Sequence, residues 1–265
     1  MNETAATLSQ VTLAVWTEGF VFIMAGLFMR VSAFVFSLPG LGERSIPVRV
    51  RLAAAMAFSI TLFPVVQAHA PQQPETVAAI VASLGAETIN GLVLGFATRI
   101  FVFILQLSGA MIAQNLSLSQ LFGPSVGFDS ESPFASILVM AGIALAMASG
   151  LQFHLVNSFA SAYEVLEFGV FPGGSETGEW SAARTGVAFM KSLALAAPFV
   201  ILGFIYSISL AAANRAMPQL PAAFVGAPAV VITGAILFAA TAPILLLDWL
   251  KDFQNAAFDL FALAL

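Results

Sequence analysis

The sequence contains no cysteine, which excludes disulfide bonds, thiolate chemistry and cysteine-ligated zinc in one step. Charge is also scarce, because only 9% of the 265 residues are Asp, Glu, Lys or Arg. An ordinary soluble domain carries about 25%. So few charges do not cover the surface of a soluble protein. The nine Lys and Arg residues are scattered, so there is no basic patch of the kind that binds nucleic acid.

Common enzyme motifs are missing from the sequence as well. It has no Gly-x-x-x-x-Gly-Lys-Ser/Thr phosphate loop, no His-Glu-x-x-His zinc motif and no Gly-x-Ser-x-Gly nucleophile turn. The two histidines, His69 and His154, are far apart in the sequence, and we interpret each as a polar group near a helix end. We therefore expect no enzymatic activity, no metal site and no cofactor.

Apolar residues are what the chain has in excess, at 60% of the total and a mean hydropathy of +0.96. They form long runs without charge, and a membrane-spanning helix requires about 20 such residues. A membrane barrel would show alternating polar and apolar residues instead. We predict an all-α integral membrane protein with about six hydrophobic helical segments, at residues 13–37, 52–68, 76–107, 134–162, 186–213 and 229–250.

Proline is expected to break several of these segments, since it removes a backbone donor and kinks a helix. Pro64 is predicted to end the second segment, and Pro198 and Pro243 to interrupt the fifth and sixth. The expected connectors are residues 38–51, 69–75, 108–133, 164–184 and 214–228. Because the sequence shows no internal repeat and no soluble extension, we expect residues 1–265 to form a single membrane-embedded domain.

The distribution of basic residues predicts an orientation in the membrane. Connector 38–51 holds three arginines, the densest basic cluster of the chain, and Lys and Arg are enriched in cytoplasmic loops. Placing this connector in the cytoplasm also places 108–133 and 214–228 there. The N-terminus and the acidic connector 164–184 are then expected outside.

Four ionisable residues interrupt the apolar segments, namely Arg30, Glu87, Arg99 and Lys191. Insertion scales put a charge at the bilayer centre at about 2.5–3.5 kcal/mol, so such residues pair, reach the surface or line a wet cavity. We favour structural ion pairs between helices or subunits, or burial outside the hydrocarbon zone, with a proton or substrate pathway as the alternative. Glu87 and Arg99 are too far apart along one helix to pair with each other.

Two stretches of the sequence resemble the FliR family of type III export-gate subunits. Residues 41–51, Leu-Gly-Glu-Arg-Ser-Ile-Pro-Val-Arg-Val-Arg, are similar to the family's Glu-Arg-x-x-Pro-x-x-x-Arg/Lys loop after the first helix. Residues 214–220, Asn-Arg-Ala-Met-Pro-Gln-Leu, followed by Phe224, Gly226 and Pro228, are similar to its second signature. Glu87, Gly91 and Gly95 resemble a further Glu-x-x-x-Gly-x-x-x-Gly pattern, and such glycines permit close helix packing in membranes.

The resemblance implies an assembly or structural role for these motifs. The residues concerned are Glu43, Arg44, Pro47, Arg49, Glu87, Gly91, Gly95, Asn214, Arg215, Pro218, Gln219, Gly226 and Pro228. We expect Arg215 to assist assembly, by capping helix carbonyls or by pairing with an acid on a partner. An Arg215→Ala protein that assembles in full yield would argue against this.

The family's function is the function that the resemblance implies for this chain. FliR-like proteins join FliP and FliQ in the core of the flagellar export gate, with FlhA and FlhB nearby. The gate passes unfolded flagellar proteins across the inner membrane at the basal body. In the family, helical hairpins of the subunits wind around a central pore as a helical hetero-oligomer, and the loop after the third segment plugs the closed pore.

Carried onto this chain, the plug is residues 109–128, with gating candidates Asn115, Ser117, Ser119, Leu121 and Phe122. The stretch departs from the family in places, since Ala110 replaces an acid and Ala113 and Ser117 replace glycines. Its mixture of small, amide and apolar residues without charge suits a flexible gasket, and an ordinary buried connector is the alternative. We expect small residues at Leu121 and Phe122 to make an assembled gate leak ions, and unchanged membrane conductance would contradict the plug.

Three other functions remain alternatives on the sequence alone. The equivalent subunit of a virulence injectisome would share the fold and mechanism but carry different cargo. A small-molecule permease would have inverted repeats and a polar site at the midplane, and the sequence shows neither. A membrane enzyme would need a cluster of polar residues at one depth, and none is evident.

Overall fold

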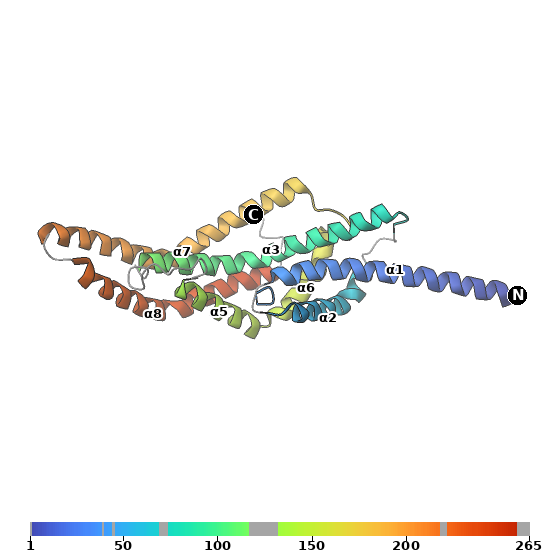
Figure 1. The fold of residues 1–265 in the computed structure, drawn as a ribbon, viewed down its shortest axis with the longest axis horizontal. Helices are drawn as coiled ribbons and strands as arrows, with labels where there is room; N and C mark the ends of the chain where they lie inside the picture. The colour runs from blue at the N-terminus through green and yellow to red at the C-terminus, as the bar shows by residue number, and fades with distance from the viewer. Residues whose placement is uncertain are drawn as a thin grey trace. The chain divides into compact units, whose positions relative to one another are not determined.

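The computed structural model describes residues 2–38, 40–43, 46–68, 74–116, 132–217 and 222–258. Every regular element in these ranges is an α-helix (Figure 1), which confirms the predicted all-α class. The helices are α1 (Asn2–Ser37), α2 (Val48–Gln67), α3 (Val77–Asn115), α5 (Pro133–Ala148), α6 (Leu151–Val165), α7 (Gly174–Ala216) and α8 (Ala222–Phe258).

Five stretches of helix are long and apolar enough to cross a membrane, as predicted for an integral membrane protein. They are Gly19–Ser37 of α1, the whole of α2, α3 and α7, and Gly226–Asn255 of α8. At 1.5 Å per residue, the 39 residues of α3 and the 43 of α7 extend about 58 and 65 Å. Because the hydrocarbon layer is about 30 Å thick, both helices reach beyond it.

The predicted fourth segment, residues 134–162, is two helices rather than one. α5 ends at Ala148, α6 begins at Leu151, and Gly150 between them has a φ of +85°. Glycine adopts this left-handed conformation without steric cost, so the chain turns there. Hydropathy does not reveal the turn, because the residues on both sides of it are uncharged.

The prediction that Pro64 ends the second segment is wrong, as is the expectation that Pro198 and Pro243 interrupt their segments. All three prolines lie inside helices, in α2, α7 and α8 respectively. A proline removes one backbone donor, and membrane proteins tolerate this where neighbouring groups satisfy the freed carbonyl. The helices also extend into the predicted connectors, since α2 begins at Val48, α3 continues to Asn115 and α7 begins at Gly174.

The chain folds into two compact units, each assembled from separate stretches of sequence. The first unit comprises Met1–Arg99, Leu151–Ser181 and Ala256–Leu265, and the second comprises Ile100–Gly150 and Ala182–Asn255. In the first unit, α2 packs against both α1 and α6. The rings of Phe34 on α1 and Phe159 on α6 meet edge to face, with centroids 5.3 Å apart.

The core of the second unit is built around Trp249 of α8. Its indole N–H donates to the carbonyl of Phe101 at 2.8 Å, and its ring stacks on Phe253 with centroids 5.3 Å apart. A Cβ atom at Gly142 of α5 would lie 2.4 Å from Cδ1 of Leu105. The Leu105 side chain of α3 therefore packs directly onto the backbone of α5 at this glycine.

Candidate functional site

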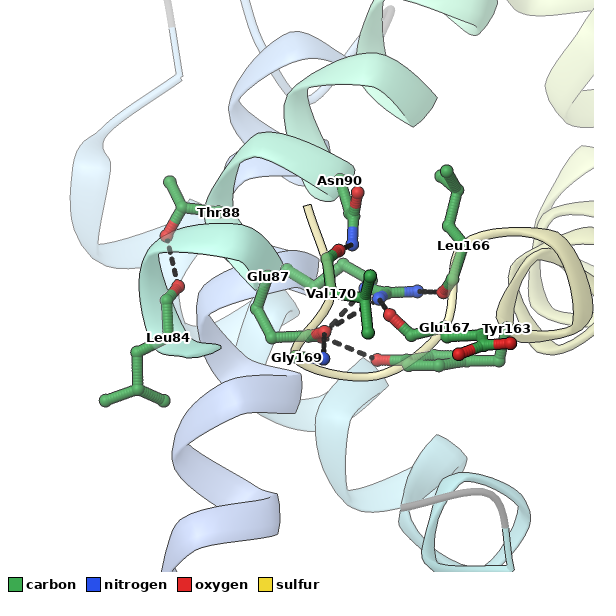
Figure 2. A network of polar contacts seen from close by, with 10 residues as sticks. Leu84, Glu87, Thr88, Asn90, Tyr163, Leu166, Glu167, Gly169 and Val170 are labelled. Carbon is green, nitrogen blue, oxygen red and sulfur yellow. Dashed lines mark hydrogen bonds and ion pairs between the residues drawn. The ribbon is translucent and has the colours of Figure 1, made fainter. Parts of the chain in front are cut away.

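A buried cluster of polar side chains joins α1, α3 and the chain after α6 within the first unit (Figure 2). At its centre lie Arg30 of α1 and Glu87 of α3, both with fully buried side chains. Arg30 Nε donates to Glu87 Oε2 at 2.8 Å, and Arg30 Nη2 donates to Glu87 Oε1 at 2.7 Å. This two-bond fork fixes both the distance and the orientation of the two groups.

Glycines on α3 bring the two helices close enough for this pair to form. A Cβ atom at Gly91 would lie 2.2 Å from the Arg30 carbonyl oxygen, and one at Gly95 would lie 2.4 Å from Ser37 Cβ. Glu87, Gly91 and Gly95 are spaced four apart, so they share one face of the helix. The close packing that the glycine spacing predicts therefore occurs here between α1 and α3.

The ion pair also binds the chain that follows α6. Arg30 Nη1 donates to the Leu166 carbonyl at 3.0 Å and Nη2 to the Glu167 carbonyl at 3.3 Å, while the Gly169 N–H donates to Glu87 Oε1 at 2.8 Å. Asn90, three residues after Glu87, donates to the Val170 carbonyl at 3.0 Å. The loop is thus attached through its backbone, and Gly169 supplies the left-handed φ of +75° that its turn requires.

Tyr163 of α6 is also part of the cluster, and Figure 2 shows its hydroxyl beside Glu87. Its hydroxyl donates to Glu87 Oε2 at 3.3 Å, and its ring lies over the guanidinium of Arg30, 3.8 Å from Cζ to the ring centroid. The ring face attracts the cation. Burial raises the pKa of the Tyr163 phenol, so the hydroxyl keeps its proton and remains a donor to the carboxylate.

The central ion pair of the cluster is fully hydrogen-bonded by the protein itself. Each nitrogen of the Arg30 guanidinium and each oxygen of the Glu87 carboxylate has a hydrogen-bond partner in the chain. With each of these atoms hydrogen-bonded within the chain, the pair has no unoccupied atom to offer a transported substrate. The arrangement fixes the geometry of three segments, which is the structural role that we favour for these residues.

The other two ionisable residues of the apolar segments are paired as well. Arg99 Nη1 lies 3.2 Å from Glu43 Oε1, and Lys191 of α7 pairs with Asp252 of α8. Both pairs are partly exposed, unlike Arg30 and Glu87. All four residues therefore form ion pairs with partners distant in sequence, as predicted, although the partner of Arg99 lies on the turn between α1 and α2 and not on a helix.

The first FliR-like motif lies at the turn between α1 and α2. Glu43 holds Arg99 through its carboxylate and accepts a hydrogen bond from Arg51 Nη2 at its backbone carbonyl. Pro47 is the residue before the first turn of α2, and Arg49 in that turn is exposed. Arg44 lies outside the residues that the structure describes.

The second motif lies around the ends of α7 and α8. Asn214 and Arg215 occupy the last turn of α7 and are exposed. Gly226 of α8 faces Tyr206, since a Cβ there would lie 2.9 Å from the ring, and Pro228 lies inside α8. Pro218 and Gln219 lie outside the described parts of the chain.

The predicted plug is described only at its start. Asn115 ends α3 and lies against α7, where its carbonyl oxygen would be 2.8 Å from a Cβ atom at Gly203. The next residue, Leu116, is fully buried against Gly234 of α8. Ser117, Ser119, Leu121 and Phe122 lie outside the described residues.

Some members of the buried cluster were not found by sequence reasoning. Tyr163, Asn90 and the backbone of 166–170 carried no signal of their own, because a carbonyl binds arginine whatever its side chain. The turn signals after α6 are Gly169 and the Pro-Gly-Gly run at residues 172–174, and they do not indicate which side chains the loop meets. Within the described ranges, no three His, Asp or Glu residues are placed to hold a metal ion.

Comparison with known proteins gives matches along most of the chain. The family model for bacterial export proteins, family 1, matches residues 21–256. Flagellar biosynthetic protein FliR of Caulobacter vibrioides is 27% identical over 237 residues, which cover 89% of this chain and 94% of the relative. Proteins of the same name from Aquifex aeolicus and Escherichia coli are 24% and 25% identical, over 91% and 82% of this chain and 93% and 83% of their own lengths.

Proposed function

Because this chain belongs to family 1 of the bacterial export proteins, we propose that it is a core subunit of the flagellar type III export gate. In this proposal it forms, with FliP-like and FliQ-like subunits, the pore for unfolded flagellar proteins in the inner membrane at the basal body. FlhA-like and FlhB-like components lie beside it. The match of the family model to residues 21–256 carries the proposal, because it includes most of both compact units.

The names of the relatives favour the flagellar system over a virulence injectisome. The similar proteins from Caulobacter vibrioides, Aquifex aeolicus and Escherichia coli are all called flagellar biosynthetic protein FliR. Both FliR-like motifs lie within the matched residues. The proposal therefore assigns flagellar proteins as the cargo.

Exposed apolar side chains on α7 and α8 support a role inside an assembly. Of the most apolar stretch of α7 only 17% is buried by the chain itself, and of that of α8 only 22%. Large side chains such as Phe204 and Ile236 are each 66% exposed. Surface of this kind is stable against lipid or against apolar helices of other subunits.

The polar cluster argues against the permease alternative. A permease needs polar groups that are free to bind a substrate near the midplane. The guanidinium nitrogens of Arg30 and the carboxylate oxygens of Glu87 are occupied by hydrogen bonds within the chain. Among the described residues, the most deeply buried charges therefore hold the subunit together.

Affinity purification tests the proposal directly. The tagged chain is expressed with its genomic neighbours, extracted in mild detergent and weighed as an intact complex by mass spectrometry. We expect FliP-like and FliQ-like chains at a fixed multi-subunit ratio. A protein that runs alone or as a homodimer while those partners are present would contradict the assignment.

Substitution of Arg215 tests the proposed assembly at a single residue. It is exposed in the last turn of α7, and none of the described residues forms a hydrogen bond or ion pair with its side chain. Arg215→Ala should leave the stability of the isolated chain within about 0.5 kcal/mol, as is usual for surface positions, and lower the yield of complex. Lys251→Ala removes an exposed cation from α8 outside the motif and is the matched control. Equal yields for the two variants would exclude a role for Arg215 in assembly.

A further inference from the structure

A cleft of about 500 Å³ lies within the first unit, next to the buried cluster, with which it shares Leu166, Glu167 and Val170. Its walls are Val93 of α3, residues 165–167 and 170–173, and Glu176, Thr177 and Trp180 at the start of α7. The volume is in the range of sites that bind small ligands or a few side chains of a partner.

One wall of the cleft is rigid because side chains of the buried cluster form hydrogen bonds with its backbone. Arg30 binds the carbonyls of Leu166 and Glu167, and Asn90 binds the carbonyl of Val170. These three wall residues therefore have fixed backbones before any partner arrives. A preorganised site loses less conformational entropy on binding than a flexible loop does.

The lining is apolar and aromatic, and much of it is exposed. Val165, Val170 and Phe171 are each more than half exposed, although all three are large hydrophobic residues. The Trp180 ring forms another part of the wall and meets Phe96 of α3 edge to face at 6.1 Å. Aromatic and aliphatic residues that line a fixed cleft are typical anchor points for an apolar side chain of a partner.

The negative charge of the cleft indicates which kind of partner binds in it. The residues from 164 to 183 contain four glutamates and no Lys or Arg, and two of the four, Glu167 and Glu176, line the cleft. Both residues are exposed, and the Glu176 carboxylate lies next to Gly173 of the cleft wall, with Oε2 3.3 Å from where a Cβ atom at Gly173 would be. An anionic or purely apolar occupant leaves these charges without a counter-ion, whereas a cation beside an apolar group satisfies both features.

We propose that this cleft docks a short protein segment of a partner that carries an apolar side chain next to a lysine or arginine. The apolar side chain fills the hollow between Phe171 and Trp180, and the cation lies between the carboxylates of Glu167 and Glu176. The docking does not depend on the export-gate proposal, because the cleft is complete within this chain.

Photo-crosslinking with a defined peptide tests the site. The full chain in zwitterionic nanodiscs carries p-benzoylphenylalanine in place of Thr177, and the probe is acetyl-Leu-Phe-Lys-Leu amide, with Gln and Glu analogues at the lysine. We expect adducts with the lysine peptide, fewer with the Gln analogue and fewest with the Glu analogue. The same photoreactive residue in place of Gly178, which is exposed and has open space around it, is the control and should give no such adduct.

Charge removal separates the cleft from the general acidity of the loop. The double change Glu167→Gln and Glu176→Gln should weaken binding of the lysine peptide about fivefold to tenfold, as expected for two partly exposed ion pairs. Glu164→Gln with Glu179→Gln removes the same charge from exposed residues that do not line the cleft, and should change binding less than about twofold. Equal losses for the two double variants would overturn the proposal.

Two further outcomes would also overturn it. Adducts of position 177 with lipid or with a second copy of the chain, in place of the peptide, would assign the cleft to another occupant. No preference among the three peptides would remove the role of the carboxylates. Each result is independent of the purification experiment, because a chain that assembles with other subunits can still fail to bind the peptide.

Discussion

Each compact unit contains an ion pair between two apolar helices, and the two pairs differ in burial. Arg30 and Glu87 in the first unit have 0% of their side chains exposed, whereas Lys191 and Asp252 in the second are 40% and 36% exposed. The buried pair is bidentate and binds three backbone groups and Tyr163 as well. Two pairs of the same chemical type therefore have different roles, one fixing geometry and one adding a contact at the surface.

Removing one partner of the buried pair should give the largest effect. Glu87→Ala leaves the Arg30 guanidinium buried without its counter-ion, and we expect a loss of about 3–5 kcal/mol in the free energy of unfolding. Denaturant titration of the purified chain in detergent measures this. Hydrogen exchange at the Gly169 N–H should also become faster, because that donor loses its acceptor.

A double variant distinguishes an unpaired charge from lost packing. Arg30→Met combined with Glu87→Leu removes both charges and keeps the space filled, so it should be more stable than either single charge deletion. The coupling between the two positions follows from the double-mutant cycle. Additive losses would mean that the pair does not act as a unit.

The glycine contact that positions the buried pair should show the next largest effect. In Gly91→Ala the new Cβ meets the Arg30 carbonyl oxygen at 2.2 Å, so α1 and α3 must move apart, at a cost of about 1–3 kcal/mol. Gly19→Ala on α1 is the matched control, since a Cβ there meets nothing within 4 Å. Alanine is the better helix former, so the control should be neutral or up to about 1 kcal/mol more stable. Similar melting temperatures for both variants would show that α3 does not need the close approach.

The exposed pair should show the smallest effect. Lys191→Met removes the cation beside Asp252, and we expect less than about 1 kcal/mol in the free energy of unfolding, as for other solvent-exposed ion pairs. The difference from the parent chain should shrink further in high salt, because salt screens exposed charges. A loss as large as that of Glu87→Ala would mean that exposure does not distinguish the two pairs.

The two FliR-like motifs could be identified from sequence because they are local strings of residues. The contacts of the positions inside them could not be identified in this way, because the Glu43 carboxylate pairs with Arg99, which is 56 residues away. Arg30, which belongs to neither string, is the most highly connected charge among the described residues of the first unit. Its partners come from α3 and from the backbone after α6, and hydropathy contains no information about either.

By itself, the sequence determined that this protein is helical and lies in a membrane, because charge-free runs of that length have no other stable arrangement. It also determined that the buried charges need partners, since an isolated charge in an apolar interior is too costly. Only the tertiary structure decided which partners these are, that residues 134–162 turn at Gly150, and that Pro64, Pro198 and Pro243 stay within helices. The reason is that pairing and close packing depend on distances between segments, and the order of residues along the chain does not contain those distances.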